Sequence, residues 1–518
     1  MTRTLPERAR PPLGTARILE VRRPRLQSDN TVSLLFCLYF SILIVVVFAL
    51  MSTRILHWFV FPLIMCGSVI GMDAILWIRG RLDLFDPVGI LGLLGYYFFF
   101  LAPLLVVHWD HRMMYLPIQP EDYRNWLGGM AILNCLGLLV YRVSRKAFRK
   151  RKKPNPAVTT WRIDGKRFGV FAAIGLVISG ILQIWIYVAY GGFSGYIAAY
   201  TSWLAGAESF KGTFWLFSIS ESFPILAMIG FAVSLRRMKS RKTWTLLAIA
   251  LAVFFVLQMI FGGLRGSRSN TIWGLFWAAG IVHLYIRRLP RVIPYFGIPF
   301  LFVFMYLYGF YKEAGPDAIK LLEGSEARAA LTQKTRRSPE VVMLSDFSRS
   351  DVQAFLLHRL LTSPKEYQYA LGRTYLGALA LVAPRPLWPD RPPGKVKWTT
   401  EAEYGIGTLG AGRLQSSRVY GLAGEAMLNF GPAVVPLSFA LLGLIVGFVR
   451  RALIGLPPSD SRLLLLPFLI NFCILFLLND SDIHVVYFIK YGAIPFTLVM
   501  LTSRKHLIPK ALPASIAR

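Results

Sequence analysis

The feature that most constrains this chain is a series of unbroken apolar runs, each about as long as a bilayer-crossing helix. Examples are 31–51, 168–190 and 292–310. A helix needs roughly 20 apolar residues to cross the hydrocarbon core, whereas soluble helices and strands alternate apolar and polar residues. Only 16% of the residues are charged and 55% are hydrophobic. We therefore predict an all-α integral membrane protein.

The net charge is +31, but the basic residues are placed next to the apolar runs and not in the pattern of a nucleic-acid-binding surface. Lys and Arg gather in short clusters just beyond the runs, which is the pattern that marks cytoplasmic loops. We expect no nucleic-acid partner, and we expect membrane lipids around the chain. The clusters lie at 145–153, 236–242, 287–291, 450–451 and 504–505.

Placing the basic N-terminus in the cytoplasm puts every one of these clusters on the same side. An even number of spans, with both termini cytoplasmic, follows from strict alternation. We expect a multi-pass protein of the bacterial inner membrane whose first run is a retained signal anchor. About twelve spans are predicted, at 31–51, 55–78, 87–107, 126–141, 168–190, 213–235, 244–262, 271–286, 292–311, 432–449, 462–478 and 484–501.

This topology divides the chain into membrane bundles and one large outer-face segment. The outer segment carries its own apolar stretches, so it is expected to fold against the bundle. We predict an amphipathic helix over 351–361 and an interfacial or re-entrant piece over 369–382. The expected parts are a basic N-terminus (1–30), a nine-helix bundle (31–311), the outer loop domain (312–431), a three-helix bundle (432–501) and a cytoplasmic C-terminus (502–518).

A Gly-rich turn with two arginines, 262–270, stands between two spans on the predicted outer side. The guanidinium groups of Arg265 and Arg268, with free backbone N–H groups near the next helix start, can approach an anion closely. Arginines are disfavoured in outer loops, which points to a function. The alternative is a cationic loop beside lipid head groups.

The stretch Pro-Arg-Pro-Leu-Trp-Pro-Asp-Arg-Pro at 384–392 is stiffened by its prolines. It presents Arg385, Arg391 and Trp388 on a scaffold of low entropy. The Trp ring is suited to stacking on a sugar, or to anchoring at head-group level. Both interpretations stay open.

A third outer stretch runs from Arg413 through Arg418 and Tyr420 to Glu425 and Asn429, at the mouth of a span. Burial would raise the pKa of the Glu425 carboxyl while nearby arginines would lower it, so it is a candidate general base. The alternative is an ion pair of Glu425 with Arg418 that fixes the loop. Asn429 is suited to orienting a sugar hydroxyl or to capping the next helix.

The short outer loop near 479–483 adds two further candidates. Asp480 and Asp482 form an Asp-x-Asp that could bind a cation, although a solvated loop is the expectation. His484 is a second candidate base, with packing at a helix end as the alternative. The four cysteines lack metal-ligand spacing and sit in apolar runs. No metal and no cofactor is predicted.

These motifs resemble those of bacterial oligosaccharide repeat-unit polymerases, the O-antigen polymerase (Wzy-type) family. The resemblance rests on Pro-Arg-x-x-Trp-Pro-Asp-Arg-Pro, on Gly-Glu-x-x-Leu-Asn-Phe-Gly at 424–431, and on the Gly-Leu-Arg-Gly-Ser-Arg-Ser turn at 263–269. The separation of Arg413 from Gly424 is also similar to an Arg-x10-Gly pattern of that family. The motif-bearing parts are 262–272 and 367–432.

The resemblance implies a metal-independent glycosyltransferase that acts on polyprenyl-diphosphate-linked oligosaccharides. A hydroxyl of one lipid-linked repeat attacks the anomeric carbon of another, and a diphosphate leaves. Such an enzyme needs cations for the leaving group and a base for the hydroxyl, here Glu425 or His484. A chain-length regulator protein is a possible partner. The expected substrate-binding residues are Arg265, Arg268, Arg385, Trp388, Arg391, Arg413, Arg418, Tyr420 and Asn429.

Three rival functions differ in their sequence signatures. A transferase using polyprenyl-phosphate sugars would carry an acidic pair after its first span, but this loop is only Ser-Thr-Arg at 52–54. An O-antigen ligase shares the arginine-rich outer loop. A flippase would show repeated halves and broken helices, whereas this sequence has few charges inside its spans, chiefly Asp73 and Lys490. Asp73 is expected to pair with a neighbour in the cytoplasmic half of its span.

Overall fold

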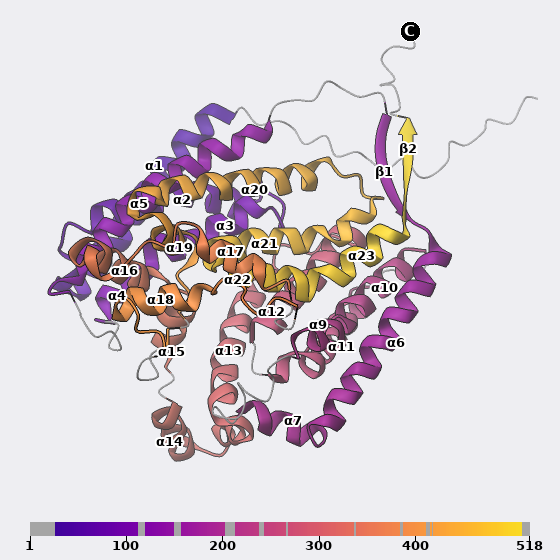
Figure 1. The fold of residues 1–518 in the computed structure, drawn as a ribbon. Coiled ribbons are helices and arrows are strands. Elements are labelled where there is room, and N and C mark those ends of the chain that lie inside the picture. Colours follow the sequence, from indigo (N-terminus) through magenta and orange to yellow (C-terminus); the bar gives the residue numbers. More distant parts are fainter. Residues whose placement is uncertain are drawn as a thin grey trace, which may run out of the picture.

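The chain folds into a largely helical body with one small two-stranded sheet among its described residues (Figure 1). This computed structural model describes residues 26–111, 120–149, 157–201, 213–237, 243–265, 268–335, 338–383, 387–410, 415–416 and 418–509. The helical architecture predicted from the apolar runs is confirmed for these parts of the chain.

Ten helical segments in the described residues are long and apolar enough to cross a membrane, so this is a multi-pass membrane protein. They are α1 (Leu26–Met51), α2 (Val60–Ile78), α3–η2–α4 (Pro87–Tyr96, Tyr97–Leu101, Ala102–His108), α5–η3 (Tyr123–Ser144, Arg145–Arg149), α6 (Gly165–Ala189), α9–α10 (Phe214–Ser220, Phe223–Arg237), α11 (Trp244–Phe261), α13 (Ile293–Ala314), η10–α20 (Pro432–Val434, Val435–Gly455) and α22–η12–α23 (Ser481–Tyr487, Phe488–Gly492, Ala493–Thr502).

The other two predicted spans are helical but fall outside this set. α12 (Arg268–Ile281) continues as a π-helix, η5 (Val282–Ile286), and α21 (Leu466–Leu478) is shorter than the predicted 462–478. Nine of the 13 residues of α21 are buried. A helix surrounded by protein does not need to match the thickness of the hydrocarbon core.

Between α13 and α20 the predicted outer segment forms mainly short helices. The helix predicted over 351–361 is confirmed as α16, and the apolar stretch 369–382 forms only the eight-residue α17. The short helices of this segment are η6 (Gly315–Leu322), α14 (Ser325–Thr335), α15 (Pro339–Val341), η7 (Val342–Asp346), α16 (Ser350–Thr362), η8 (Pro364–Glu366), α17 (Arg373–Ala380), α18 (Lys395–Tyr404) and α19 (Gly421–Phe430). Two further short helices, α7 (Gly192–Thr201) and η4 (Gly263–Arg265), precede α13.

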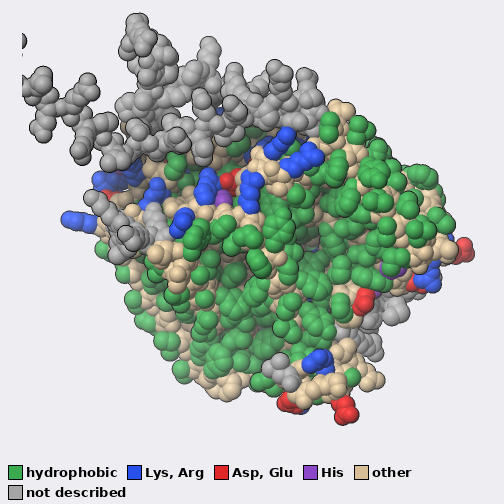
Figure 2. Space-filling model, turned by 180° about the vertical axis from the view of Figure 1, so that it is seen from behind, with side chains coloured by type: hydrophobic (Ala, Val, Ile, Leu, Met, Phe, Trp, Pro, Cys, Tyr) green, Lys and Arg blue, Asp and Glu red, His purple; other side chains and the backbone are tan. Residues whose placement is uncertain are grey.

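The outside of the body is broadly apolar. Large hydrophobic side chains project outward along α1, α6 and α13, and Figure 2 shows them as a wide continuous area with Lys and Arg gathered along one edge. Water would disfavour so much exposed apolar surface, whereas lipid would not. This surface agrees with the membrane assignment.

Close packing of α5 against α20 depends on small residues. Gly443 and Gly447 stand four apart on α20, and a Cβ at either position would lie 2.7 Å from a backbone carbonyl oxygen of α5–η3, that of Tyr141 or Arg145. Small residues at this spacing let membrane helices approach closely. The contact places the start of α20, and with it α19, against the rest of the bundle.

Segments that were predicted to face the cytoplasm contact one another. β1 (Ala157–Ile163) pairs antiparallel with β2 (Ser503–Pro509), and this ribbon projects from the helical body (Figure 1). The Asp460 carboxylate accepts the N–H of Trp161 at 3.2 Å. Three more contacts join segments of this set: Arg450 with Asp86 at 2.9 Å, Arg504 with Asp164 at 2.9 Å, and Arg236 with the Pro458 carbonyl at 2.5 Å.

The segments that were predicted to face outward also contact one another. Arg54 pairs with Asp110 at 3.1 Å, and the Trp58 indole donates to Asn125 at 2.6 Å. At the other end of the spans, the buried Asp73 carboxylate accepts two hydrogen bonds from Arg145, at 2.6 and 2.9 Å. The pairing expected for Asp73 is therefore confirmed.

Candidate functional site

Glu425 lies in the middle of α19 and is enclosed by two other segments. Its Oε1 accepts hydrogen bonds from the hydroxyls of Thr374 on α17 (2.7 Å) and Ser481 at the start of α22 (2.5 Å). Its Oε2 accepts the Ser481 N–H at 2.7 Å. Only 4% of the residue is exposed. The carboxylate therefore joins α17, α19 and α22.

The start of α19 is held by a second carboxylate. Asp480 Oδ1 accepts the N–H groups of Tyr420 at 3.0 Å and Gly421 at 2.7 Å. A carboxylate at a helix N-terminus satisfies donors that have no partner within the helix. Gly421 has a φ of +69°, and a Cβ there would lie 3.1 Å from the Leu477 carbonyl oxygen. Glycine thus permits both the turn and the close approach.

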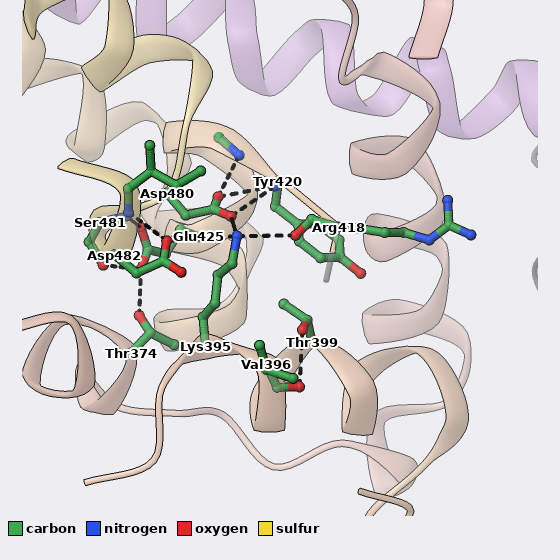
Figure 3. Close-up of polar contacts among 12 residues, drawn as sticks. Thr374, Lys395, Val396, Thr399, Arg418, Tyr420, Glu425, Asp480, Ser481 and Asp482 are labelled. Carbon is green, nitrogen blue, oxygen red and sulfur yellow. Dashed lines mark hydrogen bonds and ion pairs between the residues drawn. The ribbon is translucent and has the colours of Figure 1, made fainter. Parts of the chain in front are cut away.

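Lys395 completes what we name the Glu425 cluster: Thr374, Lys395, Glu425, Asp480, Ser481 and Asp482. Its ammonium group forms an ion pair with Asp480, lies 3.7 Å from Asp482 and donates to the Arg418 carbonyl at 3.3 Å. Figure 3 shows the lysine side chain reaching up from α18 to these groups.

The expectation of a solvated Asp480–Asp482 loop is wrong for Asp480, whereas the Asp482 side chain keeps 23% of its surface exposed. Asp480 is only 1% exposed, because Lys395 and the backbone of α19 surround it. The Lys395 ammonium lies where a cation would bind between the two carboxylates. The described residues hold no group of three or more side chains suited to a metal ion.

The surroundings of Glu425 favour its protonated form. Burial raises the pKa of this carboxyl most, the charge of Asp480 raises it further, and donation by Ser481 and Thr374 lowers it, which leaves a pKa of about 7. Burial lowers the pKa of Lys395, but the charges of Asp480 and Asp482 raise it by more, and the net effect is a raised pKa. Lys395 is thus held charged, while Glu425 can exchange a proton near neutral pH.

Asn429 and Tyr420 are buried and act within the protein. The Asn429 amide donates to Thr374 at 2.7 Å and accepts the Gly372 N–H at 2.9 Å. The Tyr420 hydroxyl donates to Glu403 at 2.7 Å. Both residues are 0% exposed. These two predicted substrate contacts therefore act inside the protein: Asn429 joins α19 to α17, and Tyr420 joins α19 to α18.

Arg418 does not pair with Glu425, so that alternative is wrong. Its Nε lies 3.2 Å from Glu403 Oε1, an acceptor on α18 that the sequence did not single out. Its side chain keeps 29% of its surface exposed. Arg385 and Arg413, also predicted to bind substrate, lie outside the described residues.

Arg265 belongs to a second polar cluster, the Glu221 cluster: Glu221, Arg265, Asn270, Lys490 and Tyr491. The Glu221 carboxylate pairs with Arg265 at 2.7 Å and with Lys490 at 2.7 Å, and it accepts the Asn270 amide at 3.3 Å. The Arg265 guanidinium also stands over the Phe217 ring, 4.2 Å from its centroid. Glu221 and Lys490 are buried.

Both segments that carry the buried charges of this cluster depart from a regular α-helix. Glu221 lies at the break between α9 and α10, and Lys490 lies on the π-helix η12. Such irregularities are frequent at functional sites in membrane proteins. Arg268, the other arginine predicted from the Gly-rich turn, begins α12 and is half-buried.

Arg391 and Trp388 lie in the stretch between α17 and α18. Arg391 lines a cavity of about 160 Å³ together with Gly377, Leu381, Pro389 and 392–394. Its guanidinium donates to the Ala383 carbonyl at 3.3 Å. Trp388 is 44% exposed. The cavity thus places a cationic group among mainly glycine and proline residues.

His484 lies on α22 but turns toward α21. Its Nε2 lies 3.0 Å from the Leu475 carbonyl oxygen, so this nitrogen carries the proton and donates it. The ring stacks on Phe476, with centroids 5.0 Å apart. His484 thus packs against α21, whereas Glu425 contacts α17 and the start of α22.

Sequence reasoning missed Thr374, Lys395, Glu403 and Glu221. No sequence feature marked Thr374 or Lys395 as a site residue, because the residues around a polar side chain do not show whether it will be buried. Glu221 did have one: it is the one acidic residue within the apolar run 213–235, and a carboxylate in a membrane span is a functional candidate by default.

Compared with known proteins, the chain matches no family model, no curated protein and no solved structure. The geometry of the two clusters therefore carries the functional argument.

Proposed function

We propose that this protein joins oligosaccharides carried on polyprenyl diphosphate into a surface polysaccharide, at the outer face of the bacterial inner membrane. One observation carries the proposal: a single helical segment, 481–502, contributes to both polar clusters. Ser481 and Asp482 lie at its start, and Lys490 follows eight residues after Asp482. That separation corresponds to about 12 Å along a helix axis.

The two clusters offer complementary chemistry. In the proposed transfer, a diphosphate leaves with growing negative charge while a sugar hydroxyl loses its proton. Arg265 and Lys490 offer cationic donors for the diphosphate, and Arg268 begins the neighbouring helix. The Glu425 cluster offers a carboxylate whose pKa of about 7 suits proton transfer near neutral pH.

The surface around α17 supports a lipid substrate. Leu376 and Leu379 on this helix are 57% and 61% exposed. An isoprenoid chain would cover these side chains while the Arg391 guanidinium meets a phosphate. An amphiphile with an anionic head group thus fits this surface better than a free sugar.

The contacts between loops support twelve spans with both termini in the cytoplasm. The basic clusters and the β1–β2 ribbon belong to one set of mutually contacting segments, and the Glu425 cluster belongs to the other. Positive charge favours the cytoplasmic side. The Glu425 cluster would then face outward, where lipid-linked repeats are joined.

The deciding experiment is reconstitution of the purified chain in vesicles with polyprenyl-diphosphate-linked oligosaccharide. Products containing two or more repeats, with release of polyprenyl diphosphate, would support a polymerase. In a deletion strain, caps of a single repeat without long chains have the same meaning. Complete loss of capping would instead indicate an O-antigen ligase.

A transporter is the second candidate, because α9–α10 breaks beside a buried Glu–Lys pair. Broken helices with polar groups at membrane depth are typical of transporters. Movement of a fluorescent lipid-linked sugar between leaflets of protein-containing vesicles, without chain extension, would favour this function over glycosyl transfer.

A further inference from the structure

The base of the proposed reaction is sealed from the substrate. Glu425 is 4% exposed, and its two oxygens already accept three hydrogen bonds. A sugar hydroxyl cannot reach either oxygen without displacing one of these donors. Of the residues that donate to Glu425, Thr374 is 1% exposed, whereas Ser481 is only half-buried. Of the two side chains that donate to Glu425, that of Ser481 is therefore the more accessible.

We propose that Ser481 is the catalytic residue that contacts the acceptor hydroxyl and passes its proton to Glu425. The inference rests on the proposed function and names the group through which Glu425 acts. Two contacts hold the serine in place: its N–H donates to Glu425 Oε2 at 2.7 Å, and its hydroxyl donates to Oε1 at 2.5 Å. With its own hydrogen directed at Glu425, the Ser481 oxygen can accept a hydrogen bond from the substrate.

The step balances without any co-reactant. The acceptor hydroxyl gives its proton to Ser481 Oγ while the Ser481 proton moves to Glu425 Oε1. The acceptor oxygen uses the freed electron pair to bond the anomeric carbon. The bond from that carbon to the diphosphate oxygen breaks, and its electrons leave with the diphosphate. Ser481 ends unchanged, and the neutral Glu425 later releases the proton.

The charged groups around this pair set its working pH. Asp480 and Asp482 are the chain neighbours of Ser481, and the Lys395 side chain approaches from α18. Tyr375, on α17, lies near the Glu425 carboxyl. Burial and the Asp480 charge raise the pKa of Glu425 to about 7. The rate should rise with pH through that value, because only the carboxylate form accepts a proton.

Thr374 provides a matched control. Its hydroxyl donates to the same oxygen as Ser481 does, at 2.7 Å, but from the buried side. Thr374→Val removes one hydroxyl donor from Glu425 and one acceptor of the Asn429 amide, which keeps the Glu425 carbonyl oxygen as its other acceptor. Loss of a donor to the charged form should raise the pKa of Glu425 further. This variant should therefore shift the pH profile upward, because it changes the pKa of Glu425 without removing the Ser481 hydroxyl.

The test measures initial rates of chain extension by the full-length protein in vesicles, from about pH 5 to 9, with polyprenyl-diphosphate-linked oligosaccharide. Ser481→Ala should lower the rate on the order of a hundredfold at every pH. Ser481→Thr keeps the hydroxyl and should stay within a few-fold of the wild type. If Ser481→Ala only moved the pH dependence of the rate to higher pH, as expected for Thr374→Val, and kept the maximal rate, the relay would be overturned.

A second measurement covers the case in which Ser481→Ala does not fold. Single-turnover rates of the wild type in mixtures of H₂O and D₂O report how many protons move in the step. Because the relay moves two protons, a plot of the rate against the deuterium fraction of the solvent should be curved. A straight line would overturn the relay. Absence of any extension by the wild type would instead refute the proposed function itself.

Discussion

Lys395 on α18 and Asp480, just before α22, form a buried ion pair that joins the segment between α13 and α20 to the last apolar helical segment. Lys395 is 6% exposed and Asp480 is 1% exposed. Because Asp480 also accepts the N–H groups that begin α19, the pair fixes three segments at once. Removing either charge would leave the other without compensation in the interior.

Lys395→Met should therefore destabilise the protein strongly. Loss of one partner of a buried ion pair typically costs about 3–5 kcal/mol. The double variant Lys395→Met/Asp480→Asn should recover much of the loss, since no unpaired charge remains. Thermal unfolding in detergent would measure both. Lys320→Met is the control, because its ion pair with Asp317 is about half exposed and should leave the unfolding temperature unchanged.

The sequence was enough to predict the ten membrane-crossing segments of the described residues, since length and apolarity are local properties. It also placed Glu425 at the mouth of a span with apolar neighbours, which anticipated its burial. Its partners could not be predicted, because Thr374 and Ser481 are 51 and 56 residues away in the chain. Arg418 illustrates the limit: it is a nearby cation, yet it pairs with Glu403 on α18.

Protonation of Glu425 should also make stability depend on pH. The folded-state pKa is about 7, above the ordinary 4.5, so the folded protein binds more protons than the unfolded chain between these values. The stabilising contribution is full below about pH 4.5 and is lost as the pH rises through 7. The shift corresponds to about 3 kcal/mol.

The measurement compares unfolding temperatures at pH 5 and pH 8 for the wild type and Glu425→Gln. The wild type should be the less stable at pH 8, whereas the Gln variant should lack this part of the pH dependence. The same variant should extend no chains, because an amide cannot accept the proton. Equal pH dependence in both proteins would contradict a pKa near 7.

Arg265 and Lys490 both pair with the buried Glu221 carboxylate. Arg265→Ala should lower the rate of chain extension on the order of a hundredfold, as for loss of one donor to a developing anion. The ion pair of Glu221 with Lys490 remains in this variant, so its membrane abundance should stay near that of the wild type. A near-normal rate of chain extension would make Arg265 a purely structural residue.

Arg268→Ala is the companion to that experiment. Arg268 begins α12 and is half-buried, so its removal should affect the rate more than the abundance. A Lys at this position should rescue the rate only partly, because an ammonium lacks the two-pronged donor geometry of a guanidinium. If the polysaccharide made by this variant had an unchanged chain length on gels, the alternative would hold, in which the Gly-rich turn only contacts lipid head groups.

The pairing of β1 with β2 can be tested with pairs of cysteines. Thr159 and Leu507 are register partners, and opposed residues in an antiparallel pair lie within the range that a disulfide can bridge. In a background without the four native cysteines, Thr159→Cys/Leu507→Cys should cross-link under mild oxidation. Thr159→Cys/Lys505→Cys, displaced by two residues, should cross-link much less.

Labelling of single cysteines then assigns the two sides. Leu387→Cys, at a position that is 80% exposed, should react with a membrane-impermeant thiol reagent in intact cells. Lys505→Cys on the ribbon should react only after the membrane is permeabilised. The physical reason is the same positive charge that marks the ribbon side as cytoplasmic. Reversed labelling would place the Glu425 cluster in the cytoplasm, where repeat units are built rather than joined, and would contradict the proposed polymerase.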